Sequence, residues 1–116
     1  MTTEVMLQGK VVKSKQELML ASVLTEEELP FRYQVAIDGG TFRRGGYLLD
    51  FEVYTPMTYA VPVQGNYWHK NEIDSDERLM LTRLEQIYGL SYVKPIWESE
   101  MQDIDAIRSW VRSNLK

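Results

Sequence analysis

The spacing of apolar and polar residues along the chain predicts four β-strands. Apolar side chains occupy every second position from Phe31 to Ile37, which is the pattern of a half-buried strand. Apolar runs from Tyr47 to Tyr54 and from Tyr59 to Val63 predict a second and a third strand, joined as a hairpin. A fourth strand is predicted from Tyr92 to Ile96.

Three helices are predicted around these strands. The first extends from Ser14 to about Leu24, because Ser14 and Glu17 have the spacing of a capping box that closes the start of a helix. A second capping box begins a helix at Asp74, and Asp103 caps the last one. The predicted apolar faces are Leu20, Ala21 and Leu24 in the first helix; Leu79, Met80, Leu84 and Ile87 in the second; and Ile104, Ile107, Trp110 and Val111 in the third.

The order of these elements predicts a single α/β domain covering residues 1–116. The helix between the third and fourth strands is long enough to be a crossover, so these two strands are expected to be parallel, with a right-handed connection. An antiparallel hairpin followed by a parallel pair gives a mixed β-sheet of about four strands with helices on both faces. A chain of 116 residues has room for one core.

Composition narrows the possible chemistry. The chain has no cysteine and one histidine, so disulfides, thiolate metal sites and a cysteine nucleophile are excluded. A metal ion would be held mainly by carboxylate and carbonyl oxygens, which favours magnesium, manganese or calcium. No apolar run approaches about 20 residues, the length of a membrane span, and the first residues lack the apolar core of a secretory signal. We therefore expect no membrane partner, and a location in the cytoplasm or inside a virus particle.

The net charge of −4 argues against strong non-specific binding to nucleic acid, because neutralising phosphates needs clustered Lys and Arg. Two basic clusters nevertheless occur. One holds Lys10, Lys13 and Lys15, and the other holds Arg43 and Arg44 beside two glycines. Both clusters fit a solvated surface. The alternative for Arg43 and Arg44 is a contact with the phosphates of DNA.

A carboxylate in the second predicted strand is the main candidate for chemistry. Asp50 lies within an apolar run, and an ionised carboxylate is costly to bury without a partner. It is therefore either a ligand for a metal or a substrate, or an acid at a sheet edge. Glu52 lies two residues further on and is expected on the same face, because the side chains of a strand alternate. The alternative for Glu52 is a side chain that faces solvent.

Six segments of the chain, in their order and spacing, resemble the restriction-endonuclease-like superfamily, the PD-(D/E)XK nucleases. The segments are SKQELMLASVL, PFRYQVAI, YLLDF, QGNYWH, TRLEQIYGL and KPIWESE. They are most similar to the very short patch repair endonucleases and to small endonuclease-like proteins related to them. The resemblance extends from about Ser14 to Leu115 and implies the same mixed α/β fold.

The resemblance also implies a metal site. Asp50 matches the Asp that binds a divalent cation in these nucleases, which would be magnesium if the protein is catalytic. Glu17 matches a helical Glu present in many members, although its capping role explains it equally well. The acidic residue and the Lys of the next strand fall on Pro62 and Gln64, so the charges of that motif are missing.

The patch-repair branch lacks the same strand acid and uses a backbone carbonyl there, together with histidines. Gly65 to His69 matches its Gly-aromatic-Trp-His element, which implies the Val63 carbonyl as a metal ligand and His69 as a catalytic group. Lys70 becomes a candidate DNA contact, and Asp74 or Asp76 a further catalytic residue. The alternative for His69 is an ordinary surface histidine.

Two functions follow from the resemblance. The first is a degenerate endonuclease-like domain without catalysis, which binds DNA or has a structural role in a larger assembly such as a phage or mobile-element particle. The alternative is a metal-dependent DNA endonuclease or nickase of the very short patch repair type, with magnesium and with the catalytic residues Asp50, His69, Glu52 and Glu17. The expected partners are DNA and other proteins, copies of the chain included, without a small-molecule cofactor.

Overall fold

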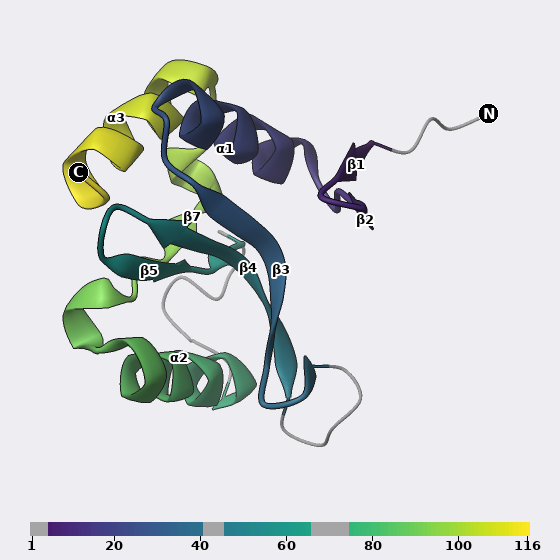
Figure 1. Cartoon of the computed structure of the whole chain (residues 1–116), viewed down its shortest axis with the longest axis vertical. Helices are drawn as coiled ribbons and strands as arrows, with labels where there is room; N and C mark the ends of the chain where they lie inside the picture. Colours follow the sequence, from purple (N-terminus) through teal and green to yellow (C-terminus); the bar gives the residue numbers. More distant parts are fainter. Residues whose placement is uncertain (1–4, 41–45, 66–74) are drawn as a thin grey trace.

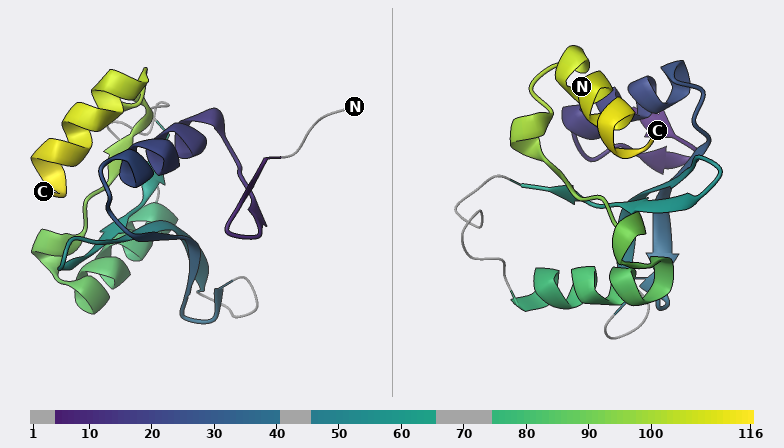
Figure 2. Two further views of the ribbon diagram at one scale, coloured as in Figure 1. Left: turned by 45° about the horizontal axis from the view of Figure 1, so that its top comes forward. Right: turned by 90° about the vertical axis from the view of Figure 1, so that its left-hand side faces the viewer.

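The computed structural model describes residues 5–40, 46–65 and 75–116. Three α-helices lie on the two sides of a small sheet in these ranges (Figure 1). Helices α1 (Lys15–Glu26) and α3 (Ile104–Asn114) cover one face, and α2 (Ser75–Tyr88) covers the other (Figure 2). The predicted mixed α/β architecture with helices on both faces is confirmed at this level.

In the described ranges the strands form separate small sheets, not the single mixed sheet of about four strands that the sequence predicts. One sheet is antiparallel and has the order β3 (Phe31–Ile37), β4 (Tyr47–Tyr54) and β5 (Thr58–Val61). Alternation and the flanking turn residues predict the bounds of β3 and β4, and both are confirmed. Tyr33 lies opposite Phe51, and Phe51 lies opposite Val61, which sets the register of all three strands.

A separate parallel pair of strands follows β5. Strand β6 (Val63–Gln64) runs parallel to β7 (Ile96–Trp97), and an isolated parallel bridge joins Ala60 to Val93. Residues 60–64 therefore run alongside residues 93–97, with α2 in the connection between them. The predicted parallel pairing is confirmed, although part of the predicted fourth strand is the 3₁₀ helix η3 (Leu90–Tyr92).

Pro62 is buried at the junction of these two ladders. Strand β5 ends at Val61 and β6 begins at Val63, so proline occupies the one position between them. Its carbonyl accepts a hydrogen bond from the Ile96 N–H at 3.0 Å. The N–H that proline lacks would point to the same edge, so Pro62 removes one possible bond there, at the break between β5 and β6, which is the kind of irregular position where proline occurs in a sheet.

Two apolar clusters hold the layers together. The larger one joins α1, α3 and one face of the sheet, and its largest buried members are Tyr33, Phe51, Leu20, Leu24, Met101, Ile107 and Leu115. The smaller one joins α2 to the other face and contains Ile37, Leu49, Ala60, Leu84 and Val93. The predicted buried faces of α1 and α3 agree with the larger cluster.

The predicted apolar face of α2 is partly wrong. Leu84 is buried and Met80 is half-buried, but Leu79 is 69% exposed and Ile87 is 45% exposed. The helix instead turns Leu81 and Tyr88 toward the sheet. Leu81, Leu84 and Tyr88 have the spacing of one helical stripe, and apolar residues on more than one side of α2 made the choice ambiguous from sequence.

A short hairpin at the start of the described chain was not predicted. It consists of β1 (Met6–Leu7) and β2 (Lys10–Val11), joined by Gln8 and Gly9, which both have positive φ. The Gln8 side chain donates to the Phe31 carbonyl and accepts from the Tyr33 N–H, each at 2.8 Å. The hairpin thereby covers the outer edge of β3, which would otherwise offer unpaired backbone groups. No helix in the described ranges is long and apolar enough to cross a membrane.

Candidate functional site

Two carboxylates from different elements approach each other between α1 and the sheet. Glu17 comes from the first turn of α1 and is 6% exposed, and Asp50 comes from the middle of β4. Burial of the Asp50 carboxyl raises its pKa to about 6. The Glu17 charge raises this pKa further, whereas the Val63 N–H and the Lys13 ammonium lower it. The effect of the Glu17 charge on Asp50 indicates that these two candidate residues belong to one region of the fold, and their roles there stay predictions.

Glu17 is held in place by hydroxyl groups. The Tyr33 hydroxyl donates to Glu17 Oε1 at 2.5 Å, and the Ser14 hydroxyl donates to Oε2 at 3.2 Å. Ser14 Oγ also accepts from the Glu17 N–H at 3.2 Å, which is the expected helix cap. Burial, and then the hydrogen bond to Glu17, raises the pKa of Tyr33 to about 12, so its hydroxyl remains a donor at neutral pH. The capping role of Glu17 and its place beside Asp50 are compatible.

Asp50 is bound to the backbone of the neighbouring strand. The Val63 N–H donates to Asp50 Oδ2 at 2.8 Å. The carbonyl of the preceding residue, Pro62, points toward β7. In an extended strand the N–H and C=O of one residue point to the same edge, and those of the next residue point to the other edge. The Val63 carbonyl is therefore expected on the Asp50 side, where the resemblance predicts a metal ligand.

At Asp50 the β3–β4 pair rotates, so that alternate side chains before and after it point to different faces of the sheet. Opposite it, Gln34 has a φ of +54°, and these two residues are not paired although their neighbours on both sides are. Phe51 belongs to the cluster under α1 and α3, whereas Leu49 belongs to the cluster under α2. Residues two apart normally share a face, so β3 and β4 must rotate between these positions, and Figure 1 shows their strong twist.

This rotation separates Glu52 from Asp50. The Glu52 carboxylate accepts hydrogen bonds from the hydroxyls of Tyr54 and Tyr88, and Tyr88 belongs to α2. Asp50 instead faces Glu17 of α1, on the opposite side of the sheet. The expectation that Glu52 shares the face of Asp50 is therefore wrong, because an alternating pattern assumes an unbroken pleat.

The two positions that the resemblance aligns with charged residues are neutral and enclosed. Pro62 is buried, and Gln64 is 5% exposed. Residues 5–40, 46–65 and 75–116 contain no group of three His, Cys, Asp or Glu side chains arranged for a metal ion. Asp50 and Glu17 carry carboxylate oxygens, the ligand type that magnesium prefers, and magnesium commonly uses one or two carboxylates and completes its shell with water or phosphate.

Lys13 is a residue of this site that sequence reasoning missed. Its backbone N–H donates to the Tyr33 hydroxyl oxygen at 3.3 Å, while its side chain is exposed. The signal in the sequence was its position directly before Ser14, which caps the helix that carries Glu17. Sequence reasoning grouped Lys13 with Lys10 and Lys15 as a basic cluster without connecting it to Asp50.

Several predicted residues lie outside the described ranges. These are His69, Lys70, Asp74 and the pair Arg43 and Arg44. Asp76 lies within α2, but the description does not extend to its side chain.

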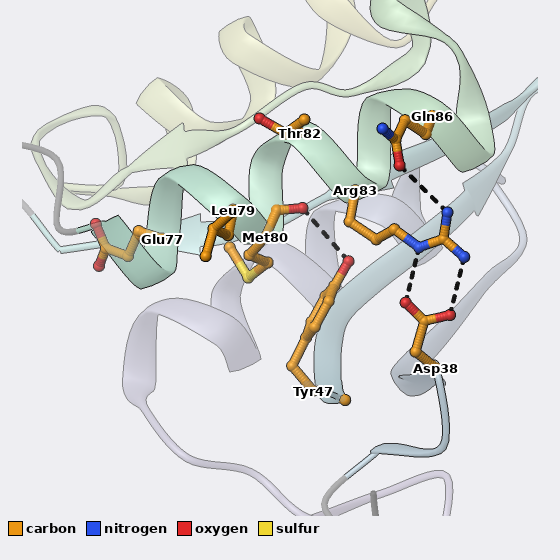
Figure 3. Close-up of a pocket in the computed structure, with 9 residues that line it drawn as sticks. Asp38, Tyr47, Glu77, Leu79, Met80, Thr82, Arg83 and Gln86 are labelled. Atoms are coloured by element: carbon orange, nitrogen blue, oxygen red, sulfur yellow. Dashed lines mark hydrogen bonds and ion pairs between the residues drawn. The ribbon is translucent and has the colours of Figure 1, made fainter. Parts of the chain in front are cut away.

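A separate pocket of about 740 Å³ lies between α2 and the end of the β3–β4 pair (Figure 3). Arg83 donates to both carboxylate oxygens of Asp38, at 2.8 and 3.2 Å, and thereby links α2 to the turn after β3. The lining residues are Asp38, Gly46, Tyr47, Glu77, Leu79, Met80, Thr82, Arg83 and Gln86. None of these belongs to the Asp50 site, so the pocket and the predicted site are different places.

Comparison of the chain with known proteins finds no matching family model, no matching curated protein and no matching solved structure. Function is therefore inferred from the side chains of the site.

Proposed function

We propose that the chain is a nuclease-like domain that binds DNA at the Asp50–Glu17 site without cutting it. One observation carries this proposal. The two carboxylates that the resemblance predicts, Asp50 and Glu17, are present, whereas the two further positions of the motif are occupied by neutral residues. Pro62 and Gln64 supply neither a third carboxylate nor an ammonium group. Both are enclosed by the fold, so neither side chain is presented to a substrate.

The carboxylate pair supports cation binding, which favours this proposal over a site that has lost all function. Asp50, Glu17 and the Val63 carbonyl would hold magnesium, and bound magnesium would offset their negative charge toward a phosphate. The Tyr33 and Ser14 hydroxyls fix the Glu17 carboxylate, and the Val63 N–H fixes that of Asp50. The chain thus orients both acids, while Pro62 and Gln64 themselves supply no ionised group to activate water.

A metal-dependent endonuclease or nickase is the second candidate function. It is favoured by the state of the Asp50 carboxyl, whose pKa is raised by burial and further by the nearby Glu17 charge. Such perturbed acids are common at functional sites. In this case the groups that activate water would come from outside the described residues, where His69 and Lys70 lie.

One experiment separates these functions. Supercoiled plasmid is incubated with the wild-type chain or with Asp50→Ala, in magnesium or in manganese, while binding of a fluorescein-labelled duplex is followed by anisotropy. We expect binding in the presence of magnesium, with no nicked product. Nicking that disappears in Asp50→Ala establishes the endonuclease instead. Absence of both binding and nicking contradicts the proposal and leaves the structural role in a larger assembly.

A further inference from the structure

We infer that Lys13 is the residue of the Asp50–Glu17 site that contacts a backbone phosphate of bound nucleic acid. This inference rests on the proposed function and names the side chain that would attract the phosphate to the site. Two ionised carboxylates repel a phosphodiester, so a site built around them needs a cation that belongs to the protein or is bound by it.

The fold fixes the position of Lys13 through its backbone. The Lys13 N–H bonds the Tyr33 hydroxyl oxygen, and the same hydroxyl donates to Glu17. The next residue, Ser14, makes two further hydrogen bonds to Glu17. The start of the Lys13 side chain is therefore linked to Glu17 by a network of four hydrogen bonds, none of which involves its ammonium group.

The side chain of Lys13 is placed differently from that of its neighbour Lys10. The Lys10 ammonium donates to the Tyr33 and Gln34 carbonyls, both at 2.8 Å, and so completes the cover of the β3 edge. Lys13 is exposed, and its charge acts on the Asp50 carboxyl. Lys10 therefore has a structural task, while Lys13 brings a positive charge to the site and leaves it accessible to solvent.

An exposed ammonium beside a carboxylate pair suits a phosphodiester better than a neutral ligand. A lysine side chain reaches several ångströms beyond its anchored backbone and acts as a point charge toward phosphate. Its contact with phosphate releases condensed counterions from the nucleic acid, which makes the contribution measurable as a salt dependence. A cation that served only the stability of the fold would not change that dependence.

The test compares Lys13→Ala, Lys13→Arg and Lys15→Ala with the wild-type chain. Lys15 is an exposed lysine two residues away, so its removal changes the net charge by the same amount. Binding of a labelled duplex is measured by anisotropy over a range of salt concentrations, with magnesium present. Thermal unfolding of each variant checks that the fold is retained.

We expect Lys13→Ala to weaken binding by about 5-fold near 0.1 M salt and to reduce the slope of log affinity against log salt by about 1. Lys13→Arg should restore both values, and Lys15→Ala should leave the slope near that of the wild type. Equal effects of Lys13→Ala and Lys15→Ala overturn the inference while leaving the proposed function intact. A wild-type chain that does not bind the duplex overturns both.

Discussion

Asp50 and Glu52 lie two residues apart on β4, yet their carboxylates are bound on opposite faces of the sheet. Asp50 accepts a hydrogen bond from the Val63 N–H and faces Glu17 of α1, whereas Glu52 accepts from Tyr88 of α2. The two acids therefore have different electrostatic surroundings and are expected to respond differently to neutralisation.

Replacing Asp50 by asparagine should stabilise the protein at neutral pH. The folded state raises the pKa of Asp50 from 3.8 to about 6, mainly by burial, so folding favours the protonated carboxyl. The stability from this group is complete below the unfolded pKa and is lost as the pH rises through the folded pKa, to a total of roughly 3 kcal/mol. We expect Asp50→Asn to unfold at higher urea concentration than the wild type at pH 7.5.

The same comparison over a pH range checks the cause of this effect. The stability gap between Asp50→Asn and the wild type should widen by about 2 kcal/mol from pH 4.5 to pH 7.5, because only the wild type ionises Asp50 in that window. A gap that is constant with pH would mean that Asp50 titrates normally.

Replacing Glu52 by glutamine should destabilise the protein, which is the opposite of the effect expected for Asp50→Asn. The Glu52 carboxylate accepts from two tyrosine hydroxyls, and hydrogen bonds to an ionised acceptor are the stronger kind. We expect Glu52→Gln to lower the free energy of unfolding by about 1–2 kcal/mol at pH 7.5 and to leave duplex binding unchanged. Weakened binding at unchanged stability would contradict its placement on the α2 face.

Removing the Tyr33 hydroxyl should destabilise the site and the fold together. Tyr33→Phe leaves the buried Glu17 carboxylate without its 2.5 Å donor and the Lys13 N–H without its acceptor. The expected loss is about 2–3 kcal/mol by urea unfolding. Tyr59→Phe is the matched control, because that half-buried ring packs on Tyr92 and should lose its hydroxyl at little cost. Equal losses in the two variants would show that the Glu17 contact adds nothing.

Replacing Gln8 by alanine should open the edge of β3. The Gln8 amide makes the two 2.8 Å bonds that occupy the Phe31 carbonyl and the Tyr33 N–H. We expect hydrogen exchange of the Tyr33 amide to accelerate by about 10-fold, since each bond contributes on the order of 1 kcal/mol. The control is Gln102→Ala, at an exposed position before α3. An unchanged exchange rate at Tyr33 would mean that the hairpin does not protect this edge.

Local patterns predicted much of the fold because each depended on neighbouring residues. Alternation defined β3, and the hydrogen bond between Ser14 and the Glu17 N–H defined the start of α1. Glu17 and Asp50 were each named as candidate site residues, although from the resemblance and not from spacing. The structure contains these local features because no long-range contact competes with them.

The remaining features depend on contacts that no local pattern contains. The face of Glu52 was mispredicted because Gln34, on another strand, introduces a positive φ where the pair rotates. Leu79 is exposed because of the orientation in which α2 packs against the sheet. Lys13 was missed because its link to Glu17 passes through Tyr33, twenty residues further along the chain.

The packing of α1 against α3 has a consequence for synthesis of the chain. Leu20 and Leu24 are covered by a cluster that includes Ile107 and Leu115, and Arg108 and Arg112 pair with Glu26 and Glu27 at its rim. A nascent chain that stops before α3 leaves the apolar face of α1 open to solvent, whatever part of the sheet it has made. Completion of the core therefore waits until α3 has emerged from the ribosome, and chains that stop before α3 are expected to be substrates for chaperones and proteases.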